Sequence, residues 1–107
     1  MSNLDFTICC TVTFYSKKRR TPPNLNNGKY CPHLVIKGFD QLLVVNFIDG
    51  EDVIFDKQIG ANALPVNEDI DYSALQVGTE FLIMDSGNVV GEGIVKEIFQ
   101  HKPHGSK

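Results

Sequence analysis

The chain has no apolar run that approaches the roughly 20 residues of a membrane-spanning helix. Its first ten residues, MSNLDFTICC, have neither the basic segment nor the small-residue cleavage site of a signal peptide. The three cysteines form no C-x-x-C pair, and an odd number without an export signal is typical of reduced thiols. These absences predict a cytoplasmic protein without a membrane partner.

A strong excess of charge of either sign is also lacking. The net charge is -3, and residues of both signs are spread along the 107 positions. Because a basic balance would favour nucleic acid, any nucleic-acid surface here has to be a local patch. Hydrophobic residues make up 42%, enough for the core of a single domain. We expect this domain over residues 1–100 and a flexible tail over residues 101–107.

The periodicity of the chain is that of strands, and no helical periodicity of useful length is present. Between residues 4 and 15, apolar residues occupy one face and threonine-rich positions the other, with Ile8, Cys10 and Val12 on the apolar side. Five further strands are expected in the ranges 30–37, 41–49, 52–66, 79–85 and 88–99. Six strands in so short a chain predict an all-β fold, a closed six-stranded antiparallel β-barrel without exposed edges.

Several local features accompany these strands. Asp85-Ser86-Gly87-Asn88 predicts a hairpin turn in which glycine supplies a positive φ angle. In the last strand, Val90, Ile94 and Ile98 are expected on one face, and Gly91 and Gly93 leave room for a bend or a close backbone approach. The acidic loop NEDIDYSALQVG is expected to hold at most a helical turn, with Ile70, Tyr72 and Leu75 packing beneath it.

The segment NNGKYCPHLVIKG combines a turn, a proline and two potential metal ligands. Pro32 has no N–H group, which predicts a strand start, a bulge or an edge. Cys31 and His33 share one face, but a zinc site needs two further ligands and no second pair is present. We therefore interpret this segment as a barrel element that presents Tyr30 and His33 on its surface, and we expect no metal site.

Two longer stretches, RRTPPNLNNGKYCPHLVI and DYSALQVGTEFLIMDSGNVVGEGIVKEIF, contain a second set of motifs. Their order resembles the C-terminal β-barrel domain of elongation factor Tu, as a free-standing small bacterial protein. The resemblance covers residues 5–99 and is poor over residues 39–67. The matching positions are Thr21, Pro22, Asn27, Gly28, Tyr30 and Pro32 in the first stretch, and Gly87, Val90, Gly91, Gly93 and Val95 in the second.

This resemblance implies the same barrel and a translation-related partner. In that family the barrel helps to hold the T-stem of aminoacyl-tRNA and contacts the exchange factor and the nucleotide domain. Here Met84 and Asn88 stand where the family has arginines in its hairpin, and His33 replaces a glutamine. Fewer cations weaken phosphate binding, so RNA is the weaker expectation. No Gly-rich phosphate loop with its lysine is present, so we expect no nucleotide.

Three other groups of residues were candidates for chemistry. The basic run Lys17 to Arg20 is either a solvated loop or a contact for phosphate or an acidic protein. Glu68, Asp69 and Asp71 form an acidic cluster that is either solvated or binds a basic partner, since acid–base catalysis would need a cleft. Ser86 has no G-x-S-x-G context, and the spacing of the histidines predicts no triad.

The sequence thus predicts a cytoplasmic, non-enzymatic binding module without a cofactor, most simply one that binds a protein. The alternatives are an RNA-binding barrel related to translation, an immunity or antitoxin-type protein, and an enzyme with a polar cleft. Catalytic residues are not expected. The candidate partner-binding residues are Arg19, Arg20, Tyr30, His33, Met84, Asp85 and Asn88.

Overall fold

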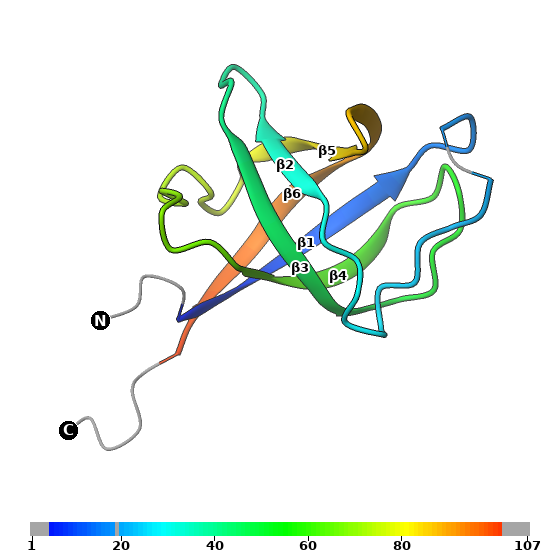
Figure 1. The fold of residues 1–107 in the computed structure, drawn as a ribbon. Helices are drawn as coiled ribbons and strands as arrows, with labels where there is room; N and C mark the ends of the chain where they lie inside the picture. Colours follow the sequence, from blue (N-terminus) through cyan, green and yellow to red (C-terminus); the bar gives the residue numbers. More distant parts are fainter. Residues whose placement is uncertain (1–4, 19, 102–107) are drawn as a thin grey trace.

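A computed structural model describes residues 5–18 and 20–101, and these residues form six strands and no helix. All neighbouring strands are antiparallel, and their order β1-β4-β3-β2-β5-β6 closes into a barrel (Figure 1). The predicted all-β, six-stranded closed barrel is confirmed. The strands are β1 (Phe6–Phe14), β2 (His33–Ile36), β3 (Leu42–Gly50), β4 (Ile59–Pro65), β5 (Glu80–Asp85) and β6 (Asn88–Gln100).

The interior of the barrel is filled by apolar side chains. In β1 the predicted alternation is observed, since Ile8, Cys10 and Val12 are buried and the residues between them are half-buried. In β4, Ile59, Ala61 and Ala63 point inward, and the two alanines leave space for the large rings of the core. Among the described residues no polar or charged residue is buried. Burial of apolar surface therefore dominates the stability of the domain.

The last strand departs from its predicted face pattern because it contains two β-bulges. In the β5–β6 pairing, Ile83 lies opposite Gly91 and Met84 opposite Val89, so Val90 is the additional residue. In the β1–β6 pairing, Lys96 is skipped in the same way. Each bulge reverses the alternation, so Val90 and Val95 are buried, whereas Ile94 lies opposite the exposed Glu80 on the outer face. The prediction that Val90, Ile94 and Ile98 share one face was wrong.

The two glycines of β6 are required by close packing. A Cβ atom at Gly93 would lie 2.6 Å from the Phe81 ring, and one at Gly91 would lie 2.5 Å from the Thr13 carbonyl oxygen. The turn before them also uses glycine as predicted, because Gly87 has a φ of 83°. Ser86 has a φ of 53°, so both central residues have the left-handed conformation that a two-residue hairpin needs.

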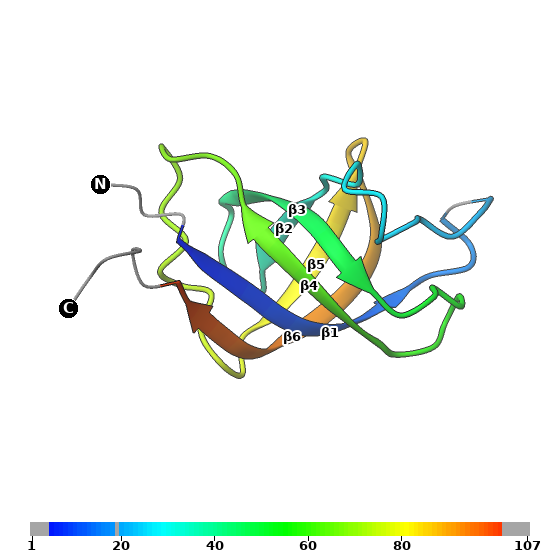
Figure 2. The ribbon, with the colours of Figure 1, turned by 90° about the horizontal axis from the view of Figure 1, so that it is seen from below.

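The direction of the strands defines two ends, which lie on opposite sides in Figure 2. At the first, which we call the hairpin end, the β5–β6 turn lies beside the loop of residues 15–32. At the second, which we call the acidic end, β1 begins, β6 finishes and the loop of residues 66–79 connects β4 to β5. Side chains from the two loops close the barrel: Leu25 at the hairpin end, Tyr72 and Leu75 at the acidic end.

Residues 30–32 show how the second strand begins. Pro32 lies directly before β2, which agrees with a strand start, and its carbonyl accepts a hydrogen bond from Val45 N at 3.1 Å. The Tyr30 carbonyl accepts one from Phe47 N at 3.0 Å, so this segment follows β3 without regular pairing. None of the described residues belongs to a helix long and apolar enough to cross a membrane.

Candidate functional site

Four of the predicted contact residues come together at the hairpin end. His33 at the start of β2 lies opposite Met84 in β5, and Asp85 lies opposite Asn88 across the β5–β6 turn. His33 and Asn88 are exposed, whereas Met84 and Asp85 are half-buried. We call these four residues the hairpin surface. The β2–β5 pairing brings His33 to residues that lie about fifty positions away in the sequence.

The other three predicted contact residues are placed differently. Arg20 is exposed in the loop of residues 15–32, and Arg19 lies outside the described residues. Tyr30 is half-buried, and its ring centroid lies 5.9 Å from that of Phe47 and 6.0 Å from that of Phe14. The ring of Tyr30 therefore packs on the core and its hydroxyl oxygen is buried, so the expected presentation of Tyr30 on the surface does not hold for this hydroxyl group.

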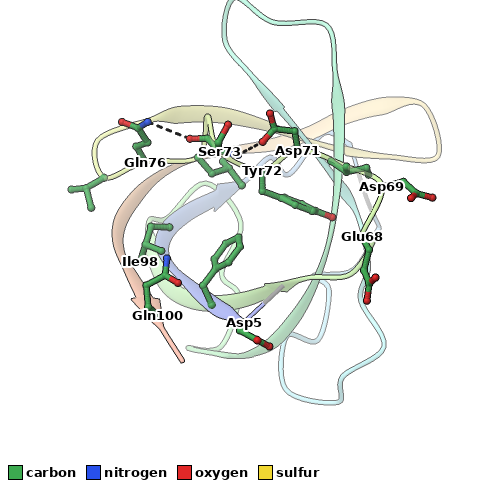
Figure 3. Close-up of a pocket in the computed structure, with 13 residues that line it drawn as sticks. Asp5, Glu68, Asp69, Asp71, Tyr72, Ser73, Gln76, Ile98 and Gln100 are labelled. Carbon is green, nitrogen blue, oxygen red and sulfur yellow. Dashed lines mark hydrogen bonds between the residues drawn. The ribbon is translucent and has the colours of Figure 1, made fainter. Parts of the chain in front are cut away.

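A hollow of about 820 Å³ opens at the acidic end, and we call it the acidic hollow (Figure 3). Its size falls in the range of roughly 300–1,000 Å³ that is usual for ligand-binding pockets. Its walls come from the start of β1, the end of β6 and the loop of residues 66–79. The lining residues are Asp5, Phe6, Glu68, Asp69, Ile70, Asp71, Tyr72, Ser73, Leu75, Gln76, Val77, Ile98 and Gln100.

The floor of the acidic hollow is apolar and belongs to the top of the core. Tyr72 and Leu75 are buried, and Phe6, Ile70 and Ile98 pack against the core cluster from the rim. The rings of Phe6 and Tyr72 meet edge to face, with their centroids 6.2 Å apart. The predicted packing of Ile70, Tyr72 and Leu75 beneath the acidic loop is therefore confirmed, although the loop forms turns without a helix.

The loop of residues 66–79 is held by hydrogen bonds to the barrel and within itself. The Tyr72 hydroxyl donates to the Val44 carbonyl at 2.5 Å and accepts from the backbone N–H groups of Val66 and Asn67 at 3.3 Å. The Thr79 hydroxyl donates to the Ala74 carbonyl at 3.1 Å. The Tyr72 hydroxyl thus bonds both β3 and the residues that follow β4. The shape of the hollow therefore depends on the positions of these two strands.

Four carboxylates surround the apolar floor, and the described lining contains no basic residue. Figure 3 shows the side chains of Asp5, Glu68, Asp69 and Asp71 distributed around the periphery of the hollow. The Ser73 backbone N–H donates to Asp71 Oδ1 at 2.9 Å, and this bond, with a second from the Ser73 side chain, lowers the pKa of Asp71. Asp71 is therefore ionised at neutral pH, and the hollow presents negative charge.

Exposed apolar side chains are concentrated at the same end of the barrel. Phe39 lies in the connection between β2 and β3, and Leu42 is the first residue of β3. Val66 follows β4, and Phe99 lies near the end of β6. Val77 lines the acidic hollow itself and is 66% exposed. Among the described residues, Ile54 is the only exposed large apolar residue at the hairpin end.

The thiols differ in their environments and do not converge. Burial, followed by the neighbouring Cys9, raises the pKa of Cys10 to about 12, and its Sγ lies 3.6 Å from the Ala61 carbonyl. Cys9 is half-buried on the outer face, and Cys31 is exposed. Within residues 5–18 and 20–101, no three His, Cys, Asp or Glu side chains come together in a way that could hold a metal ion.

Sequence reasoning named three of the four carboxylates of the acidic hollow but not the hollow. Asp5 and Ile98 join the site because the start of β1 pairs with the end of β6, where Phe6 lies opposite Gln100. In comparisons with known proteins, no family model matches the chain, and no curated protein matches it significantly.

Proposed function

We propose that this barrel is a non-enzymatic module that binds a protein through its outer surface at the acidic end. The observation that carries the proposal is that five exposed large apolar side chains lie around the end where the hollow opens, and that one of them, Val77, lines it. Apolar groups gathered on one face of a small domain are characteristic of interaction sites. The opposite end exposes only Ile54 among the described residues.

The chemistry of the hollow favours binding over catalysis. Glu68, Asp69 and Asp71 are exposed to solvent, whereas acid–base catalysis by carboxyl groups needs a sheltered cleft. The lowered pKa of Asp71 makes its carboxylate a weaker proton acceptor. An ionised, solvated rim around an apolar floor is instead suited to recognising a complementary surface.

A cytoplasmic location and a translation-related partner are parts of the same proposal. Three free thiols, Cys9, Cys10 and Cys31, support a reducing compartment. The closed barrel supports the resemblance to the C-terminal domain of elongation factor Tu at the level of fold class. The hairpin surface offers a second position for the partner.

Affinity capture from the native cell, read by mass spectrometry, tests the proposal. The variant Val77→Asp places a charge on the exposed apolar surface of the acidic end, and Ile54→Asp does the same at the hairpin end as the matched control. We expect the protein partner to be lost with Val77→Asp and retained with Ile54→Asp. Thermal melting of both variants establishes that neither has unfolded.

Other outcomes would overturn parts of the proposal. Loss of the partner with His33→Asp but not with Val77→Asp would move the binding site to the hairpin surface. Recovery of tRNA instead of protein, with an affinity that falls steeply with added salt, would replace the protein-binding function by RNA binding.

A further inference from the structure

The acidic hollow combines two features that select different parts of one ligand. The floor formed by Phe6, Tyr72 and Leu75 can cover an apolar side chain and remove it from water. Above this floor the rim carries the carboxylates of Asp5, Glu68, Asp69 and Asp71, which require a cationic counterpart (Figure 3). A neutral apolar ligand would satisfy the floor but not the rim.

We propose that the acidic hollow is the docking site for a basic peptide segment that inserts one apolar side chain between its cationic residues. This inference rests on the proposed protein-binding function and names the chemistry of the partner. Charge complementarity determines the choice of occupant, because four of the residues around the hollow are acidic and no described lining residue is basic. Arginine and lysine side chains of the segment pair with the rim, and the apolar residue contacts the floor.

The carboxylates of Glu68 and Asp69 are available to a ligand because other groups hold the loop in place. Its anchoring hydrogen bonds come from Tyr72, Thr79 and the Asx-type turns at Asn67 and Asp71. The carboxylates of Glu68 and Asp69 accept none of these bonds. A loop that is already ordered loses little conformational entropy on binding, which favours affinity.

The exposed cations of one loop lie at the end of the barrel away from the hollow, an end that also carries the exposed carboxylates of Glu51, Asp52 and Asp56. The loop of residues 15–32 at the hairpin end carries Lys17, Lys18, Arg20 and Lys29, all exposed. The hollow, at the other end, is therefore far from the cations of this loop, and its field attracts a basic segment and repels an acidic one. Attraction of this kind is screened by salt, since the charges are exposed to solvent.

Fluorescence anisotropy with a labelled peptide, Arg-Arg-Leu-Phe-Arg-Arg, tests the inference on the full chain. Two control peptides separate the contribution of charge from that of the apolar side chains. One replaces the arginines by glutamates, and the other replaces Leu-Phe by Ser-Gly. The protein variants are the double substitution Glu68→Gln and Asp69→Asn at the rim and Val77→Ser in the apolar lining. The matched control is Asp52→Asn, an exposed carboxylate near the hairpin end.

We expect each carboxylate removed to weaken binding about threefold, and the double variant therefore about tenfold at low salt. Binding should weaken with Val77→Ser and with the Ser-Gly peptide, and remain unchanged with Asp52→Asn. Equal weakening per charge removed in the double variant and in Asp52→Asn would show attraction to net charge alone and overturn the inference, as would equal binding by all variants. Equal binding of the arginine and glutamate peptides would do the same.

Two further results distinguish this inference from the proposed function. If the basic peptide does not bind while Val77→Asp still abolishes capture of the cellular partner, the acidic end binds a protein of different chemistry, and only the inference fails. If analytical ultracentrifugation shows a dimer that the double variant dissociates, the occupant is a second copy of the chain, which also overturns the basic-peptide assignment.

Discussion

The substitution Gly93→Ala tests the packing of the barrel at one point. Gly93 in β6 faces the interior directly beneath Phe81. A Cβ atom at this position would lie 2.6 Å and 2.7 Å from two carbons of the Phe81 ring and 2.7 Å from the Thr11 carbonyl oxygen. Ordinary contacts of a Cβ atom begin at 3.4 Å, so each of these atoms would have to move by several tenths of an ångström.

Neither obstacle can move cheaply. Phe81 is fully buried in a filled core, so its ring has no space to enter. The Thr11 carbonyl belongs to the β1 backbone, which pairs with β6 at this position. Overpacking of a core costs about 1–3 kcal/mol, and we expect the upper end, about 3 kcal/mol, because one obstacle is backbone. For a domain of this size that lowers Tm by about 15 °C.

Urea unfolding followed by circular dichroism measures the effect. Gly60→Ala is the control, since a Cβ atom there would meet only the flexible Glu51 carboxylate, at 3.1 Å, and should cost less than about 1 kcal/mol. Adding Phe81→Leu to Gly93→Ala should destabilise by less than the sum of the two single changes, because the smaller side chain relieves the overlap. If Gly93→Ala were as stable as the unsubstituted protein, the register of β5 against β6 would be wrong.

Three other predictions concern single side chains. Tyr72→Phe should lower the free energy of unfolding by about 2 kcal/mol, measured in urea, because the Val44 carbonyl loses its donor. Iodoacetamide should label Cys31 rapidly and Cys10 only on unfolding, as read by mass spectrometry. The raised pKa of Cys10 means that the unfolded thiol ionises first, near its ordinary value of 9.0, so stability should decline above that pH. The decline should approach about 1.4 kcal/mol per pH unit, and Cys10→Ala should reduce it.

The barrel could be predicted from the sequence because most of its strands follow a strict alternation. In β1 the apolar residues at every second position determine which face is buried, and a shift by one residue would expose all of them. The turn at Ser86 and Gly87 was equally predictable, since a two-residue hairpin needs positive φ angles. Both features depend on neighbours within a few residues.

The bulges of β6 could not be predicted in the same way. Val90 and Lys96 are ordinary strand residues, and although Gly91 beside Val90 allowed a bend, nothing near either residue indicated where the additional residue in the pairing would fall. The bulges follow from closing the barrel, because β6 must pair with β5 along one edge and with β1 along the other. Gly93 was identified as a close-approach position, but its neighbour Phe81 depends on this register.

The candidate site was predictable only in part for a related reason. The acidic cluster of Glu68, Asp69 and Asp71 and the apolar residues beneath it are local and were recognised. The contribution of Asp5 and Ile98 requires the pairing of the first strand with the last, which no local pattern specifies. Tyr30 was predicted as a surface contact, but its ring packs on Phe47. This contact depends on the position of β3 beside residues 30–32, which no local pattern specifies.

The arrangement separates the part of the chain that maintains the fold from the part that can recognise a partner. A filled interior and a ring of paired strands leave no space for a ligand inside, so binding specificity has to come from the connections. Two of these connections differ in charge: the loop of residues 15–32 carries Lys17, Lys18 and Arg20 at one end, and the loop of residues 66–79 carries Glu68 and Asp69 at the other. Because the rigid barrel keeps these ends apart, the two charged regions cannot neutralise each other within one molecule. The basic segment proposed as the occupant would therefore meet a hollow whose described lining contains no cation.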